Sequence, residues 1–77
     1  MKKLSNIPLS ELRRFLTKVG CKQIEAKGDH EKWVRSDLTR PIVLQQTKNP
    51  PPEFVVKNML RDLGMTRKEF LRIFLEP

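Results

Sequence analysis

Hydrophobic residues near the start of the chain recur at helical spacing. They fall three or four positions apart, which is typical of a helix with one apolar face; the members are Leu9, Leu12, Phe15, Leu16 and Val19. Pro8 suits the first turn of such a helix, and Gly20 suits its C-terminal end. The pattern predicts a first helix from Leu9 to Gly20.

The next segment changes to patterns that are typical of short strands. Residues 21–27 lack helical spacing, and Gly28 with Asp29 then indicates a hairpin turn. A second strand is predicted over residues 30–35, and the β-branched residues within 41–46 predict a third. Three short antiparallel strands follow from this reading.

Alternation along the second strand assigns its side chains to two faces. One face carries His30, Lys32 and Val34, and the other carries Glu31, Trp33 and Arg35. We expect Trp33, the sole tryptophan, to be a core residue under the helices rather than a platform for RNA bases. His30 then faces solvent.

The C-terminal third predicts two helices after a proline-rich crossing. Residues 47–53 contain three prolines, which are stiff and donate no backbone hydrogen bonds, so we expect an extended crossing. An apolar face over residues 56–63 predicts a second helix that ends at Gly64. Thr66 and Glu69 have the spacing of a capping box, which predicts a short third helix.

Together these elements predict an α+β fold in one domain over residues 1–77. The order is α-β-β-β-α-α, with the helices on one face of a three-stranded antiparallel sheet and the other face left to solvent. A chain of this length buries only about 60% of its unfolded surface, so we expect any functional site to be shallow.

The composition favours a polyanionic partner. The chain has 16 Lys and Arg against 9 Asp and Glu, a net charge of +7, which attracts nucleic acid over long range. We expect a cytoplasmic protein without membrane contact, because no run approaches the roughly 18 apolar residues of a membrane span and no signal-peptide pattern is visible. With Cys21 as the only cysteine and a single histidine, we expect no disulfide, no zinc site and no cofactor.

His30 is the residue that we single out for chemistry. Imidazole can take and give a proton near neutral pH without environmental tuning. RNA carries its own nucleophile, the 2′-hydroxyl, so one positioned acid or base plus neutralised phosphate charge suffices for cleavage without a metal. Asp29 either orients the imidazole by accepting a hydrogen bond or is a turn residue bonded to its own backbone.

Basic residues around His30 are the candidates for binding the RNA backbone. Lys32 shares its strand face, and Lys27 reaches in from the turn. The full set of predicted substrate-binding residues is Lys22, Lys27, Gly28, Lys32 and Arg35.

With this order and these residues, the chain resembles the HicA family of bacterial toxin-antitoxin ribonucleases. The resemblance lies in the helix from Leu9 to Gly20, the turn Lys27-Gly28-Asp29-His30, and the segment from Met59 to Phe70. In that family a glycine, a serine and a histidine usually form the turn, and the histidine is catalytic; here Asp29 stands in the place of the serine. The resemblance implies a fold like that of double-stranded-RNA-binding domains, cleavage of mRNA, and control by a HicB-type antitoxin.

Two other functions fit the same sequence. Residues 56–74 resemble a helix-turn-helix with a glycine in its turn, which would make the chain a DNA-binding protein. The second alternative is a non-catalytic RNA-binding module of the same fold, which would bind RNA and leave it uncut.

Overall fold

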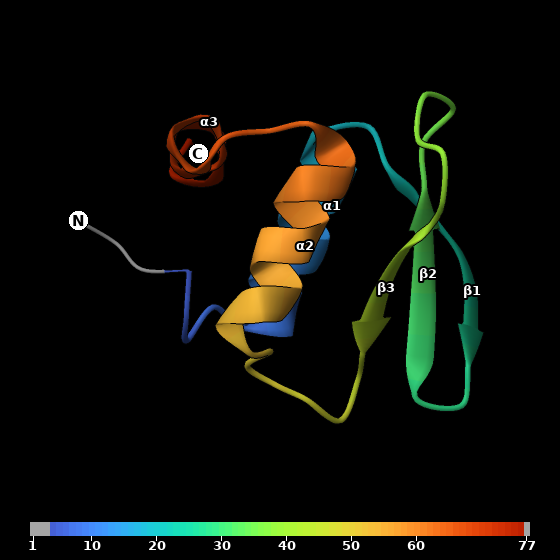
Figure 1. Cartoon of the computed structure of the whole chain (residues 1–77). Helices are drawn as coiled ribbons and strands as arrows, with labels where there is room; N and C mark the ends of the chain where they lie inside the picture. Colours follow the sequence, from blue (N-terminus) through green and yellow to red (C-terminus); the bar gives the residue numbers. More distant parts are fainter. Residues whose placement is uncertain (1–3, 77) are drawn as a thin grey trace.

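The computed structural model describes residues 4–76 and confirms the predicted α+β fold (Figure 1). Its elements are α1 (Leu9–Lys18), β1 (Lys22–Lys27), β2 (His30–Val34), β3 (Ile42–Gln45), α2 (Glu53–Leu63) and α3 (Arg67–Phe74). The helices lie on one side of the sheet, and the other side is left uncovered by them (Figure 1). This is the α-β-β-β-α arrangement of double-stranded-RNA-binding domains, with α3 added at its end.

The sheet is antiparallel with the order β1-β2-β3, so β2 is central and both other strands are edges. His30 pairs with Lys27 on β1 and with Gln45 on β3. The β1–β2 turn is short because Gly28 has a φ of +59°, a left-handed conformation that type II′ hairpin turns place at their first central residue. The register and the turn together fix where His30 enters the sheet.

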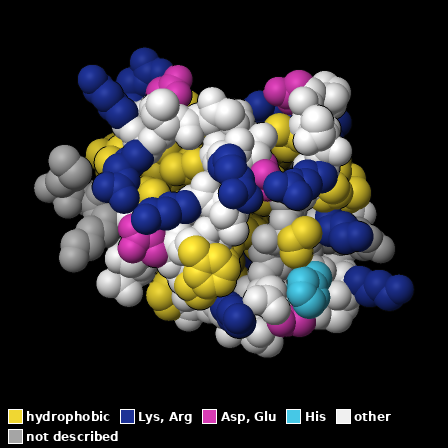
Figure 2. Space-filling view, viewed as in Figure 1, with side chains coloured by type: hydrophobic (Ala, Val, Ile, Leu, Met, Phe, Trp, Pro, Cys, Tyr) yellow, Lys and Arg dark blue, Asp and Glu magenta, His cyan; other side chains and the backbone are white. Residues whose placement is uncertain are grey.

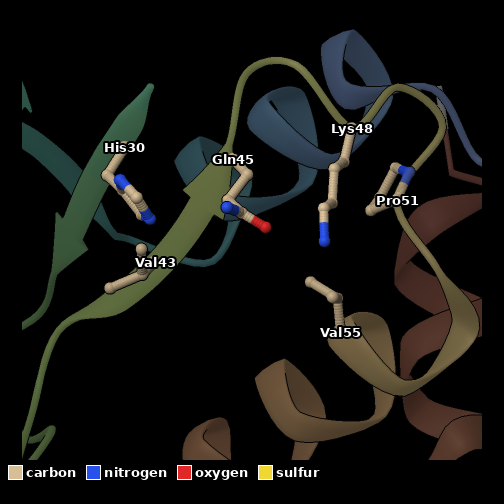
Figure 3. A pocket seen from close by; sticks show the side chains of 6 residues that line it. All are labelled: His30, Val43, Gln45, Lys48, Pro51 and Val55. Atoms are coloured by element: carbon tan, nitrogen blue, oxygen red, sulfur yellow. The ribbon is translucent and has the colours of Figure 1, made fainter. Parts of the chain in front are cut away.

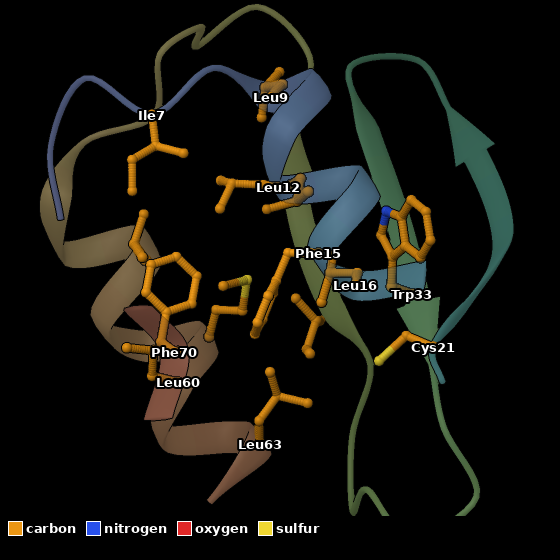
Figure 4. Close-up of a cluster of buried hydrophobic side chains, with 14 of the residues drawn as sticks. Ile7, Leu9, Leu12, Phe15, Leu16, Cys21, Trp33, Leu60, Leu63 and Phe70 are labelled. Carbon is orange, nitrogen blue, oxygen red and sulfur yellow. The ribbon is translucent and has the colours of Figure 1, made fainter. Parts of the chain in front are cut away.

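A single apolar core joins the helices to the inner face of the sheet (Figure 4). The ring of Phe70 on α3 is fully buried and meets Phe15 of α1 edge to face, with 4.7 Å between ring centroids. Trp33 lies on the inner face of β2 and is 5% exposed, so its predicted place in the core is confirmed. Cys21 is also buried in this cluster.

The charged side chain of Glu31 is buried on the inner face of the sheet. Glu31 on β2 is 1% exposed, and its carboxylate accepts hydrogen bonds from Arg13 of α1, at 2.9–3.2 Å, and from the Trp33 indole, at 2.9 Å. The side-chain amide of Gln46 donates a further bond at 3.3 Å. Because a buried carboxylate must be paired to be tolerated, this network ties the start of β2 to α1 and to the segment after β3.

The helix ends follow the sequence signals. Gly64 ends α2 with a φ of +67°, and the Met65 amide donates to the Leu60 carbonyl at 2.9 Å. Thr66 and Glu69 form the predicted capping box at the start of α3. No helix within residues 4–76 has the length and apolar character needed to cross a membrane.

Candidate functional site

His30 lies on the outer face of the sheet, away from the helices. Its neighbours Glu31 and Trp33 are buried on the inner face, so alternation turns the imidazole toward solvent, as predicted. Within residues 4–76 the side chain makes no hydrogen bond and no ion pair. The imidazole is therefore accessible to a ligand and is not held by the protein.

A pocket of about 320 Å³ opens beside His30 at the free edge of β3 (Figure 3). The sheet contributes three side chains to it, and the loop after β3 and the first turn of α2 contribute the opposite wall (Figure 3). The lining residues are His30, Val43, Gln45, Lys48, Pro51 and Val55. The pocket thus combines the one histidine, one ammonium group and one amide with three apolar side chains.

The loop between β3 and α2 is bent rather than extended, which corrects the prediction of an extended crossing. A turn at Gln46 and Thr47 leads into bends through residues 48–50, and the Lys48 amide donates to the Gln45 carbonyl at 3.2 Å. Asn49 holds the loop on its other side, because its side-chain oxygen accepts the backbone N–H of Leu9 at 3.0 Å. The bond to Gln45 and the neighbouring bond from Leu9 to Asn49 hold the backbone at Lys48, whose side chain lines the pocket (Figure 3).

Asp29 is the main anchor of this loop. Its carboxylate accepts the Thr47 backbone N–H and the Thr47 hydroxyl, each at 2.8 Å, and its carbonyl accepts the Gln46 N–H at 2.7 Å. The predicted hydrogen bond from His30 to Asp29 is absent within residues 4–76, and so is a bond from the carboxylate to its own turn. Both oxygens are occupied by Thr47, so Asp29 holds the pocket wall rather than the imidazole.

Thr47 also sets the acidity of this carboxylate. The hydrogen bonds from the Thr47 side chain and backbone lower the pKa of Asp29, with smaller electrostatic contributions from His30 and Lys48. We call these two hydrogen bonds from Thr47 to Asp29 the Asp29–Thr47 clamp. The clamp is fully formed above the ordinary Asp pKa of about 3.9, and it is lost only as pH falls through the lower pKa that Asp29 has in the folded protein.

Removing the Thr47 hydroxyl tests the clamp directly. We expect Thr47→Val to raise the pKa of Asp29 toward its ordinary value, because the largest cause of the lowering is removed. The measurement is a carboxyl-carbon NMR titration of wild type and variant. Thr17→Val is the matched control, since its hydroxyl donates to the Arg13 carbonyl at 3.0 Å, away from the loop. An Asp29 pKa that is equal in wild type and Thr47→Val contradicts the clamp.

Of the predicted substrate-binding residues, three lie near His30. Lys27 is its cross-strand partner and is exposed on the same face, and Gly28 forms the adjoining turn. Lys32 follows on the same face of β2 and pairs with Val43 of the pocket. These positions place two ammonium groups on the surface that carries the imidazole.

Lys22 and Arg35 lie at the other end of the sheet, which separates them from the predicted site. Lys22 pairs with Val34, four residues from His30 and so about 13 Å along the strand. Arg35 is held by Asp37, at 2.6 and 2.9 Å, and by the Val19 carbonyl, at 2.8 Å. Its guanidinium joins the end of α1 to the end of β2, so we assign it a structural role.

Gln45 and Lys48 are site residues that the sequence prediction missed. An antiparallel β3 places its last residues opposite the first residue of β2, so Gln45 was derivable as the neighbour of His30 from topology. Lys48 was not, because its place depends on the Thr47 and Asn49 hydrogen bonds. Figure 2 shows the histidine open to solvent, with Lys and Arg side chains on both sides of it.

Residues 4–76 contain no group of three or more His, Cys, Asp or Glu side chains placed to hold a metal ion. The fold and the site together define a small basic α+β domain with an exposed histidine beside a shallow pocket. Comparison of the chain with protein-family models, curated proteins and solved structures finds no significant match.

Proposed function

We propose that this chain is a metal-independent endoribonuclease of the HicA type in which His30 is the catalytic residue. The observation that carries the proposal is the exposed imidazole at the mouth of a pocket that also holds the Lys48 ammonium group. A histidine packed in the core or bonded to a carboxylate would not support it.

The reaction needs two proton transfers and stabilisation of phosphate charge. A base takes the 2′-hydroxyl proton, the 2′-oxygen attacks the adjacent phosphorus, and the bond to the 5′-oxygen breaks as that oxygen gains a proton. His30 performs one of these transfers, as general base or general acid, and water performs the other. The products are a 2′,3′-cyclic phosphate and a 5′-hydroxyl.

Lys48 and Lys27 supply the positive charge in this proposal. Lys48 faces the pocket from the loop, and Lys27 lies across the turn from His30. Ammonium groups on either side of the imidazole stabilise the charge that develops on the non-bridging oxygens in the transition state. We assign Lys48, in place of Lys22 and Arg35, to the predicted set of phosphate contacts.

The proposed cellular setting follows from the resemblance to HicA proteins. The substrate is mRNA in the cytoplasm, and a HicB-like antitoxin covers the site until it is removed. The net charge of +7 favours a partner that presents acidic residues to the same surface.

Incubation of the purified protein with single-stranded RNA in excess chelator tests the proposal. We expect cleavage at an unchanged rate, because no step uses a metal, and we expect 3′ ends that carry a cyclic phosphate. Loss of cleavage in chelator, or products with 5′-phosphate ends, contradicts the mechanism. The readouts are denaturing gel electrophoresis and mass spectrometry of the fragments.

Two outcomes of the same experiment would replace the proposal. RNA that is bound and left uncut identifies a non-catalytic RNA-binding module. Tight, sequence-dependent binding to duplex DNA without RNA cleavage identifies a helix-turn-helix protein that uses α2 and α3, where Lys68 and Arg72 are exposed.

A further inference from the structure

The pocket beside His30 has two chemically different parts. His30 and Lys48 form the part that carries ionisable groups, and the other four lining residues form an apolar part with one amide. Val43 and Gln45 line it from β3, and Pro51 and Val55 line it from the loop and α2 (Figure 3). Three of these four side chains are apolar, so they offer van der Waals contact and no hydrogen bonds. Gln45 contributes the one amide side chain in the lining.

The Gln45 amide is available for a ligand. The backbone carbonyl of Gln45 accepts a hydrogen bond from the backbone N–H of Lys48, but within residues 4–76 the Gln45 side chain makes no hydrogen bond. Gln46, one residue on, uses its amide on the buried Glu31. A glutamine amide presents one donor and one acceptor side by side, and it lies half-buried next to His30.

A nucleobase matches this lining. It has two apolar faces and an edge of adjacent donors and acceptors, and the pocket volume of about 320 Å³ lies at the lower end of the range for small-ligand sites, roughly 300 to 1,000 Å³. Bases in a duplex are stacked and paired, so only an unpaired base can enter such a pocket.

We infer that the pocket receives one unpaired base of single-stranded RNA and that Gln45 recognises the edge of that base. This inference rests on the proposed function, since it names the substrate of the same site. The base lies between Val43 and the wall made by Pro51 and Val55, and its phosphate remains near Lys48 and His30. Gln45 is thus a specificity-determining residue for the nucleotide beside the scissile bond.

Binding of oligonucleotides that cannot be cleaved separates this inference from the proposed function. The probes are fluorescent 2′-O-methyl oligonucleotides of adenine, cytosine or uracil alone, in which the 2′-oxygen nucleophile is blocked. Wild type is expected to distinguish the best from the worst of them by roughly five- to hundredfold in Kd, the range of a two-bond contact to a base edge. Fluorescence anisotropy at one fixed salt concentration measures each Kd.

Gln45→Leu keeps the size of the side chain and removes its donor and acceptor. We expect it to reduce the difference between the three oligonucleotides to less than about threefold, because a leucine cannot tell one base edge from another. Gln23→Leu makes the same change at the other end of the sheet, where Gln23 pairs with Trp33, and is expected to keep the wild-type preference.

Equal affinity of wild type for all three oligonucleotides overturns the inference, as does a preference that Gln45→Leu retains. RNA cleavage without base preference leaves the proposed function standing and removes the base pocket. Base-selective binding without cleavage of ordinary RNA supports the base pocket and contradicts the proposed function.

Discussion

Replacing His30 by alanine is expected to slow RNA cleavage by about 10² to 10⁴-fold, the usual contribution of a positioned acid or base. The imidazole is exposed and makes no hydrogen bond within residues 4–76, so the variant is expected to fold and to melt as wild type does. Initial rates on a labelled single-stranded RNA give the effect on catalysis, and circular dichroism gives the melting temperature. Under the proposed toxin function, expression of wild type is expected to arrest cell growth, and expression of His30→Ala is expected to leave it unaffected.

The control for this experiment is a basic residue on the same sheet face but outside the site. Lys22→Gln removes one charge at the far end of the sheet, so it is expected to weaken RNA binding slightly and to leave the cleavage step unchanged. Equal cleavage by wild type and His30→Ala would remove His30 from the mechanism. A loss of cleavage that accompanies a large fall in melting temperature would assign His30 to the fold instead.

The sequence was sufficient for the features that depend on neighbours in the chain. The apolar spacing of α1 and α2, the Gly28-Asp29 turn and the Thr66–Glu69 capping box are all local, and each is confirmed. The outward direction of His30 was also predictable. It follows from alternation once Trp33 is assigned to the core.

The composition of the site was less predictable, because it depends on contacts between distant residues. Asp29 binds Thr47, which is 18 positions away, and Leu9 binds Asn49, which is 40 positions away. These bonds place Lys48 in the pocket, and nothing in the run of residues 47–53 shows that they form. Proline composition alone indicated a straight segment.

The same reason explains why Lys22 and Arg35 were misplaced. Charge and proximity in sequence to His30 selected them, but the antiparallel pairing carries both to the opposite end of the sheet. Arg35 then finds acceptors in Asp37 and the Val19 carbonyl, which the sequence pattern does not reveal. Proximity in sequence to a candidate catalytic residue is thus a weak indication that a basic side chain lies beside it in the fold.

Glu31 is the buried carboxylate that holds the strand carrying His30 against α1. Its carboxylate joins Arg13, Trp33 and Gln46, and it lies between His30 and Lys32 in sequence on the opposite face of β2. Burial acts to raise the pKa of Glu31, but the hydrogen bonds from Arg13, Trp33 and Gln46 outweigh it and the pKa is lowered. The ionised form is the one that holds the network together.

Arg13→Met is expected to lower the free energy of unfolding by about 2 kcal/mol, because it leaves a buried carboxylate without its counter-ion. Loss of one partner of a fully buried pair costs about 3 to 5 kcal/mol, and the 39% exposure of the Arg13 side chain reduces the effect. For a domain of this size, that loss lowers the melting temperature by about 8 to 16 °C. Arg14→Met is the matched control: its partner Glu11 is exposed, so a change below about 1 kcal/mol is expected. Equal losses from the two variants contradict the assignment.

The pH dependence of the same network provides an independent check with Glu31→Gln. Because the folded-state pKa of Glu31 is lowered, its stabilisation is complete above the ordinary Glu value of about 4.3 and is lost as pH falls through the lower folded value. Glutamine binds no proton and keeps the shape of the side chain. Wild type is therefore expected to be more stable than Glu31→Gln by a constant amount near neutral pH, and the difference is expected to shrink below about pH 4. Urea unfolding at several pH values measures it, and a difference that does not change with pH would mean that charge plays no part in how Glu31 holds β2 to α1.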